Sequence, residues 1–559
     1  MISNLEELKT YVIKSIDLYL KENLNELEDI NELEKEKKRR EYLRTHLKNA
    51  KFGDDKDKEY VKEYIKTLIT TNNNFLKENV CINNNNIKDF IDLDSNRIGR
   101  YLIYLIVLYV YKKDFLYKAF TKMIEDNDLF KLRMVDSSKG YYVDEKDIFN
   151  IYSKILSKND ERFFNSYGFN YEMHLDILVQ LIYEETYGNS NIDELMHQDI
   201  DDIGIGLSGL QSETIPRYYK QNKRFCYEGV WIKYKGSLID LRFLSLQSFK
   251  NLKNIVKESV SYNQKGQFSK SQGFLLSRGK DGSRRMACID PFAENSALWI
   301  RKFTAKNMDF DSMLGDYKNA SLVKQIAQIF IKSGASLPIC GYQGVGKTST
   351  LESLAEFIQP FYAIRVIESS FESNLRHKYP NKNILTVQEY GDVDLERAYE
   401  FSLKTTGDIY IVQEASSDSM VVDITRTANR GGRSVIFTYH PNSPKKCILE
   451  IANALLRKGI YKDLRDSLYT ALNTVNICLQ IEMDMESKKR YYNFYEFIPI
   501  NDYKDFKVVP IIEFDLDKKE YVFRNKISKE FYKELYRKSP LDEDRKLLKE
   551  IFCTDEFGE

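Results

Sequence analysis

One octapeptide constrains the fold of this chain more than any other feature: GYQGVGKT, at Gly341–Thr348. It fits the pattern G-x-x-x-x-G-K-[S/T], follows the apolar run Leu337–Cys340 and opens a helix-like segment. A strand, a glycine-rich loop and a helix in this order turn successive backbone N–H groups and a helix N-terminus toward an anion. The octapeptide therefore predicts a phosphate-binding loop inside an α/β domain.

Each residue type in this loop has its own expected task. The glycines allow positive φ angles and a close approach of the backbone to a phosphate. Lys347 places a cation at the β- and γ-phosphates of ATP, and Thr348 offers a hydroxyl group to Mg²⁺. ATP and Mg²⁺ are therefore the expected cofactors. The loop residues expected to bind the nucleotide are Gly341, Gly344, Val345, Gly346, Lys347, Thr348 and Ser349.

Apolar runs of strand length alternate with helix-like segments beyond about Leu314. This alternation is typical of a buried parallel sheet whose strands are joined by crossover helices. The carboxyl ends of such strands gather the ligand-binding residues at one edge of the sheet. The predicted strands are Leu337–Cys340, Tyr362–Glu368, Ile384–Tyr390, Asp408–Glu414 and Ser434–His440.

Three polar residues end these runs and complete the predicted catalytic set. Glu414 stands where a Walker-B-type acid belongs and would hold Mg²⁺ together with Thr348. Glu368 ends the strand that follows the helix of the loop and would orient or deprotonate the attacking water. His440 would donate to the γ-phosphate and report its loss. The alternatives are a surface position for either acid and a purely structural role for the histidine.

Proline and glycine divide the chain into regions. All ten prolines stand at Pro216 or later, and only five of the 25 glycines lie in the first 200 residues. We therefore predict a helical region of unknown role over 1–175, because a stretch poor in both breakers favours helix. Short apolar runs with turn signals predict a small α/β domain over 176–303. A linker at 304–312, a nucleotide-binding domain at 313–505 and a C-terminal hairpin with helices at 506–559 complete the prediction.

Composition excludes several other classes of protein. Lys+Arg and Asp+Glu both number 84, so no basic surplus points to nucleic acid, and we expect no direct nucleic-acid binding. The seven cysteines form no C-x-x-C pair, which predicts buried free thiols rather than a zinc ribbon or a disulfide framework. The run Tyr101–Tyr111 is too short to span a bilayer as a helix, so it predicts a buried helix. A segment that contacts a membrane is the alternative.

Residues from about 180 to 500 resemble the secretion superfamily of traffic ATPases, which serve type II and type IV secretion and assemble type IV and Tad/Flp pili. Its signatures occur in order: the Walker A motif GYQGVGKTST, the acidic box IESSFE, the Walker B motif IVQE and the histidine box TYHPNSP. The spacing in NRGGRSVIFTYHPNSP is nearest to the Tad/Flp pilus and conjugation-type branch. Upstream, LWIRKF resembles the N-terminal domain of that branch, in which the arginine, here Arg301, reaches the nucleotide.

The resemblance implies a fold and an activity. The fold is a RecA-like P-loop ATPase domain with a parallel sheet, preceded by a small α/β (PAS-like) domain and an N-terminal all-helical region. The activity is Mg²⁺-dependent ATP hydrolysis by a homo-oligomeric ring, a hexamer in the family. The ring would act on an inner-membrane platform protein of a pilus or secretion system. Its location would be cytoplasmic, peripheral to the inner face of the cell membrane.

Three departures from the family pattern concern hydrolysis rather than phosphate binding. Ser369 stands where the acidic box usually has aspartate, Gln413 replaces a glycine, and Ser416 occupies a position that often carries arginine. These departures keep open a nucleotide-gated scaffold with little hydrolysis. A conjugation-type motor for DNA transfer is the second alternative to a pilus or secretion motor.

Overall fold

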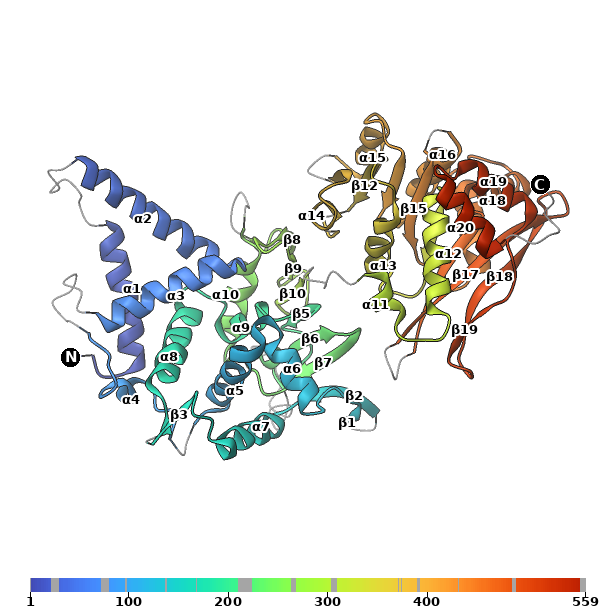
Figure 1. Cartoon of the computed structure of the whole chain (residues 1–559). Helices are drawn as coiled ribbons and strands as arrows, with labels where there is room; N and C mark the ends of the chain where they lie inside the picture. Colours follow the sequence, from blue (N-terminus) through green and yellow to red (C-terminus); the bar gives the residue numbers. More distant parts are fainter. Residues whose placement is uncertain are drawn as a thin grey trace. The chain divides into compact units, whose positions relative to one another are not determined.

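The chain divides into two compact units, Met1–Thr304 and Ala305–Glu559, which are described separately (Figure 1). The structure is a computed structural model. It describes residues 2–21, 30–71, 80–95, 98–135, 138–166, 168–209, 224–262, 268–302, 309–369, 371–373, 375–389, 393–430, 432–484 and 489–552. Most of the predicted linker, residues 304–308, lies outside the described residues. The remainder of that linker opens the short helix α11 (Phe310–Leu314), because the Asp309 carboxylate caps this helix by accepting a hydrogen bond from the Ser312 N–H.

An eight-stranded sheet, in the order β1-β2-β7-β6-β5-β10-β9-β8, organises the first unit within its described residues. The strands are β1 (Arg133–Val135), β2 (Ser138–Val143), β5 (Asp202–Ile205), β6 (Val230–Tyr234), β7 (Ser237–Leu241), β8 (Phe274–Arg278), β9 (Arg284–Cys288) and β10 (Ala297–Arg301); β3 (Phe164–Asn165) and β4 (Gly168–Phe169) form a separate hairpin. The helices are α1 (Leu5–Lys21), α2 (Ile30–Ala50), α3 (Asp55–Thr70), α4 (Ile87–Phe90), α5 (Arg100–Phe115), α6 (Ala119–Asp126), α7 (Glu145–Lys158), α8 (Tyr171–Thr186), α9 (Asp193–Met196) and α10 (Phe249–Ser259).

The predicted all-helical character of residues 1–175 needs a correction. Strand β2 pairs in parallel with β7, with Tyr141 opposite Ile239, so this region contributes two strands to the sheet of the following one. One hydrophobic core runs from Leu8 to Ile300 without a break at residue 175. Glycine and proline content alone predicts the boundary at residue 175, and that content carries no information about pairing between distant strands.

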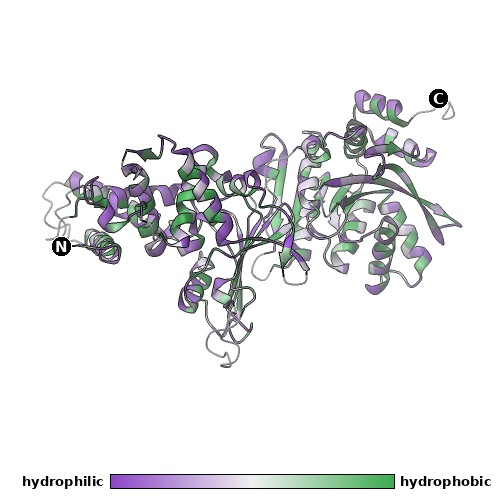
Figure 2. Ribbon diagram, turned by 90° about the horizontal axis from the view of Figure 1, so that it is seen from below, coloured by the Kyte–Doolittle hydropathy of each residue, from purple (hydrophilic) through white to green (hydrophobic). Residues whose placement is uncertain are grey.

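Helix α5 confirms the predicted buried helix at Tyr101–Tyr111. Its central residues Tyr104–Leu108 are buried in the core of the first unit. Among the described residues, no helix combines the length and the apolar character needed to cross a bilayer. Along most helices of both units hydrophobic and hydrophilic residues alternate, as in helices that cover a core with one face (Figure 2).

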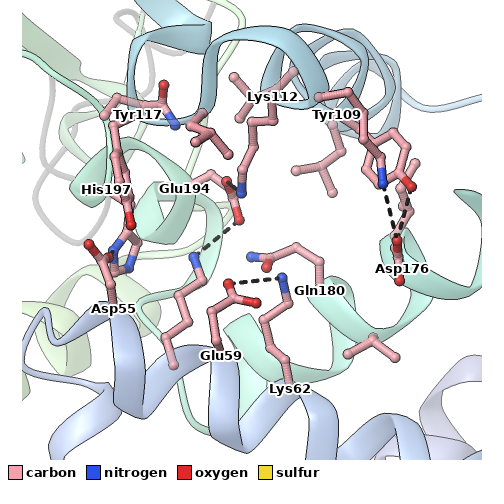
Figure 3. Close-up of a pocket in the computed structure, with 18 of the residues that line it drawn as sticks. Asp55, Glu59, Lys62, Tyr109, Lys112, Tyr117, Asp176, Gln180, Glu194 and His197 are labelled. Carbon is pink, nitrogen blue, oxygen red and sulfur yellow. Dashed lines mark hydrogen bonds and ion pairs between the residues drawn. The ribbon is translucent and has the colours of Figure 1, made fainter.

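A cavity of about 440 Å³ lies between α3, α5, α8 and α9 (Figure 3). The side chains of Lys62 and Glu59 from α3 and Lys112 from α5 extend into it. Fully buried Lys58 donates to Asp193 at 2.7 Å and to Glu194 at 3.1 Å, and Lys112 donates to Glu194 at 2.8 Å. The lysines and carboxylates therefore neutralise one another, and the buried pair ties α3 to α9.

A nine-stranded sheet, in the order β13-β12-β14-β15-β11-β16-β17-β18-β19, forms the second unit within its described residues. The strands are β11 (Leu337–Cys340), β12 (Ala363–Glu368), β13 (Asn383–Gln388), β14 (Ile409–Val412), β15 (Ser434–Tyr439), β16 (Ile477–Met483), β17 (Arg490–Ile500), β18 (Asp505–Asp515) and β19 (Glu520–Phe523). The helices are α11 (Phe310–Leu314), α12 (Ala320–Lys332), α13 (Lys347–Leu354), α14 (Leu375–Lys378), α15 (Leu395–Leu403), α16 (Asp418–Arg430), α17 (Pro444–Arg457), α18 (Leu464–Thr474), α19 (Lys529–Lys538) and α20 (Asp542–Phe552).

The six strands from β13 to β16 are parallel, which confirms the parallel sheet predicted for a RecA-like domain. All five predicted strands are present, with ends shifted by at most two residues. The predicted hairpin near Asp515 is also present, where β18 turns into β19. Because β18 pairs with β17 in the main sheet, residues 506–559 continue this sheet and its core rather than forming a part of their own.

Replacing Lys58 by methionine tests the buried ion pair. The variant leaves Asp193 in the core without its cation, so we expect the free energy of unfolding of the first unit to fall by about 3–5 kcal/mol. The two tryptophans of the chain, Trp231 and Trp299, both belong to this unit, so tryptophan fluorescence during urea denaturation of the full chain reports on it.

Lys66→Met is the matched control, because Lys66 pairs with Asp176 at 2.9 Å while both side chains remain about one-third exposed. An exposed pair of this kind stabilises by less than about 1 kcal/mol. Equal losses in the two variants would contradict a specific role for the buried pair.

Candidate nucleotide site

The backbone of the predicted phosphate loop adopts the conformation for which its glycines are needed. The loop follows β11, and the φ angles are +148° at Gly341, +83° at Gly344 and +95° at Gly346. A Cβ atom on Gly341 would lie only 2.7 Å from the carbonyl oxygen of Ile481 on the neighbouring strand. Gly346 then serves as the N-cap of α13, so the loop feeds directly into a helix N-terminus.

Lys347 is the first residue of α13, and its ammonium group is held by the loop itself. The Nζ atom donates to the carbonyl oxygens of Gly341 at 2.9 Å and Tyr342 at 3.0 Å. Burial lowers the pKa of Lys347, while the charge of Glu414 opposes that shift. A cation in such a desolvated position interacts more strongly with a phosphate than an exposed lysine does.

Glu414 and His440 lie beside this lysine. His440 directly follows β15, and Glu414 stands two residues after the end of β14. The Nε2 atom of His440 lies 2.8 Å from a Glu414 carboxylate oxygen, and its Nδ1 atom lies 3.4 Å from Lys347 Nζ. Since the ammonium group can only donate, Nδ1 accepts and Nε2–H donates to Glu414. The three side chains therefore form one hydrogen-bonded chain across three strand ends.

Glu368 occupies a different environment from Glu414. It is the last residue of β12 and only 1% exposed, whereas the Glu414 side chain is about half exposed. The Glu368 carboxylate accepts hydrogen bonds from the backbone N–H groups of Glu372 at 3.2 Å and Ser373 at 3.0 Å. Burial raises the pKa of Glu368 to about 7 despite these bonds. Within the described residues it makes no hydrogen bond to the lysine, histidine and glutamate chain.

The remaining loop residues are placed as follows. Val345 is buried in the core of the second unit, which anchors the loop. Thr348 and Ser349 are half-buried in the first turn of α13. The Thr348 hydroxyl and the Glu414 carboxylate are oxygen donors, the kind that Mg²⁺ prefers, so the residues present fit this ion.

The departures from the family pattern make defined contacts. The Gln413 amide donates to the Glu372 carboxylate at 3.4 Å, so this glutamine contacts the acidic box. The Gln413 carbonyl accepts a bond from the Thr438 hydroxyl on β15, which joins the two strands beside the site. Ser369 is half-buried and Ser416 is exposed.

Arg301 belongs to β10 in the first unit. Its guanidinium Nε donates to Asp202 at 3.1 Å, and its side chain is about one-third exposed. Arg301 and the phosphate loop belong to different units, and the contact of Arg301 with the nucleotide stays a prediction.

Sequence reasoning missed Arg490, the first residue of β17. A Cβ atom on Gly346 would lie 3.1 Å from Arg490 Nε, so this guanidinium packs directly against the phosphate loop. Its Nε atom is buried and has no hydrogen-bond partner among the described residues. No local motif surrounds Arg490. Only the pairing of β17 with β16, next to β11, brings it to the site.

The raised pKa of Glu368 predicts a dependence of stability on pH. The folded pKa of about 7 exceeds the ordinary value of 4.5, so the folded state keeps a proton that the unfolded state has lost. Stability from this group is therefore full below about pH 4.5 and falls as the pH rises to about 7. Glu368→Gln removes this fall, and we expect a gain of about 1–3 kcal/mol for the variant at pH 8 relative to pH 5.

Differential scanning calorimetry of the full chain at both pH values measures this effect. Glu414→Gln is the control, because that carboxylate is half exposed. Identical pH dependences for the parent and Glu368→Gln would contradict a buried carboxyl group.

Comparisons with known proteins place this site in a family. Residues 274–479 match the family described as Type II/IV secretion system protein. The chain is similar to the VirB11 ATPase of the Brucella suis type IV secretion system (15% identity, 52% of this chain and 88% of that chain, TM-score 0.28). It is also similar to the Legionella pneumophila ATPase DotB, with 14% identity over 63% of this chain and 85% of that chain and a TM-score of 0.36. A third similar structure is the pilus retraction motor PilT with bound ADP, with 15% identity over 66% of this chain and 94% of that chain and a TM-score of 0.38. No curated protein matches the sequence. Residues 274–479, which carry the phosphate loop, the acidic box, Glu414 and His440, therefore belong to the type II/IV secretion system protein family.

Proposed function

We propose that the chain is a Mg²⁺-dependent ATP hydrolase. One observation carries the proposal: Lys347, His440 and Glu414 form a single hydrogen-bonded chain at the strand ends next to a glycine-rich loop. This arrangement offers a cation, a proton donor and a carboxylate to one small volume. Phosphoryl transfer to water needs these groups, because its catalysis depends on positioning and charge stabilisation.

Each residue has a role in this proposal. The loop N–H groups and Lys347 bind the β- and γ-phosphates, and Thr348 and Glu414 hold Mg²⁺, which neutralises developing phosphate charge when bound. His440 donates its Nε2–H to Glu414 in the absence of nucleotide and, in this proposal, transfers that hydrogen bond to the γ-phosphate when ATP binds. Glu368 orients the attacking water and takes its proton, a task that suits a carboxyl group whose pKa is about 7.

We further propose that hydrolysis drives a motor for pilus assembly or for type II or type IV secretion. The family of residues 274–479 supports this class of machine. In this proposal the chain forms a homo-oligomeric ring, with six subunits as in the family, on a membrane platform protein at the cytoplasmic face. A conjugation-type motor for DNA transfer is the alternative within the class. The genes beside this one distinguish them: pilins with a prepilin peptidase support a pilus, and a relaxase supports conjugation.

A nucleotide-gated scaffold with little hydrolysis is the second candidate function. The contact of Gln413 with Glu372 favours it, because a side chain at this position fills space beside the acidic box where the family usually has glycine. The two candidates differ in turnover, not in nucleotide binding. Phosphate release from Mg·ATP, measured with and without membrane platform added, separates them.

Lys347→Ala tests the hydrolase directly. The variant removes the cation that faces the phosphates, so we expect phosphate release to fall to background while the circular dichroism spectrum stays unchanged. Lys382→Ala is a matched control, because Lys382 is also a lysine of the second unit that donates to backbone carbonyls, at Ala355, Glu356 and Ile358. Unchanged phosphate release in the Lys347 variant would contradict the proposal that this loop binds the ATP that is hydrolysed.

Arg301→Ala tests coupling between the two units. A planar guanidinium can chelate phosphate oxygens, and we expect it to do so when the units close on ATP. The variant should bind ATP with little loss, turn it over more slowly and lose the difference in shape between its ATP and ADP states. Small-angle X-ray scattering in both states measures that difference. A variant that closes on ATP as the parent does would show that Arg301 is not the coupling residue.

A further inference from the structure

His174, in the first turn of α8, presents an unused nitrogen atom to two aspartates. Its Nδ1 atom lies 3.0 Å from the carbonyl oxygen of Asn170, which can only accept, so Nδ1 carries the hydrogen. In the neutral ring this leaves a lone pair on Nε2. The residue is 1% exposed, and Nε2 is buried without a hydrogen-bond partner among the described residues. A second nitrogen fixed by a backbone carbonyl is the usual way in which proteins orient a metal-binding histidine.

The two aspartates lie on the segment that follows α4. One oxygen from each of Asp92 and Asp94 and one ring nitrogen of His174 all lie within 4.8 Å of one another. Asp94 Oδ2 is 3.9 Å from His174 Nε2. A first-row dication bound at about 2.1 Å from each ligand separates its ligand atoms by about 3–4 Å, so small side-chain rotations complete the site.

Both carboxylates are positioned by the backbone. Asp92 accepts a bond from the Asp94 N–H at 3.0 Å, and Asp94 accepts one from the Phe169 N–H at 3.0 Å through its other oxygen. Gly168 packs against the same carboxylate, because a Cβ atom there would lie 2.4 Å from Asp94 Oδ1. The site is therefore formed by three segments that fold together: the segment after α4, the β3–β4 hairpin and α8.

The charges of this cluster call for a cation. A ring lone pair and two carboxylates are all acceptors, and they face one another. Lys88 neutralises part of this negative charge, because its ammonium group lies 2.7 Å from Asp94 Oδ2. That side chain is about half exposed, so it can leave toward solvent when a dication takes its place.

We propose that Asp92, Asp94 and His174 bind a transition-metal dication of the Zn²⁺ class, with water in the remaining positions. The imidazole nitrogen selects such an ion over Mg²⁺ or Ca²⁺, which prefer sites made of oxygen atoms alone. The bound ion joins the segment after α4 to α8 and stabilises the helical part of the first unit. It is separate from the Mg²⁺ of the nucleotide site, which has oxygen donors and belongs to the other unit.

The test uses the full chain, stripped with a chelator and free of nucleotide. Isothermal titration with ZnCl₂ should show one site, and metal analysis after desalting should find one equivalent. Asp92→Asn keeps the acceptor oxygen for the Asp94 N–H, so it should fold, and it should bind Zn²⁺ at least tenfold more weakly. His174→Gln should do the same. Tryptophan fluorescence should show that Zn²⁺ raises the unfolding midpoint of the parent but not of the variants.

Two controls complete the design. Asp89→Asn changes a nearby exposed carboxylate outside the site and should leave Zn²⁺ affinity unchanged. Cys81→Ser removes the nearby exposed thiol and should also leave it unchanged. Equal Zn²⁺ affinity in the parent, Asp92→Asn and His174→Gln would overturn the proposal, as would loss of the site in Cys81→Ser or equal affinity for Mg²⁺. Substitution with Co²⁺ should give an absorption spectrum without thiolate charge-transfer bands.

Discussion

The desolvated ammonium group of Lys347 is the interaction on which the candidate nucleotide site depends. Its hydrogen bonds to the carbonyl oxygens of Gly341 and Tyr342 fix the conformation of the loop. Its contact with His440, which in turn bonds to Glu414, links the loop to both of these side chains. A buried cation without such partners would be costly. Its partners come from strands that are distant in sequence, so the parallel order β14-β15-β11 is what brings the chain of side chains together.

The two carboxylates of the site differ because their surroundings differ. Glu414 is half exposed and bonded to a histidine, whereas Glu368 is buried beneath the backbone of Glu372 and Ser373. Burial raises the pKa of Glu368 to about 7. Two acids with separate environments can serve separate tasks, one toward a metal ion and one toward a proton of water.

Local pattern was sufficient for part of this structure. The octapeptide at Gly341–Thr348 predicts the strand before it, the loop and the helix after it. Parallel strands place their carboxyl ends at one edge of the sheet, so the sequence also predicts His440 and Glu414 near the loop. Arg490 could not be predicted there, because it reaches Gly346 through the pairing of β17 with β16, and no short motif encodes that pairing. The pairing of β2 with β7, across about 100 residues, could not be predicted for the same reason. The Lys58 pair joins α3 to α9 and depends equally on distant contacts.

In the proposed hydrolase, His440 and Glu414 act as one unit with Lys347. A double-mutant cycle in ATP turnover tests it most directly, with His440→Ala, Glu414→Gln and the double variant compared with the parent in saturating Mg·ATP. Groups that work as one unit give losses that do not add, so the account predicts a double variant no slower than the slower single variant. A double variant whose turnover is reduced by the product of the two single-variant factors, as for independent sites, would contradict this claim.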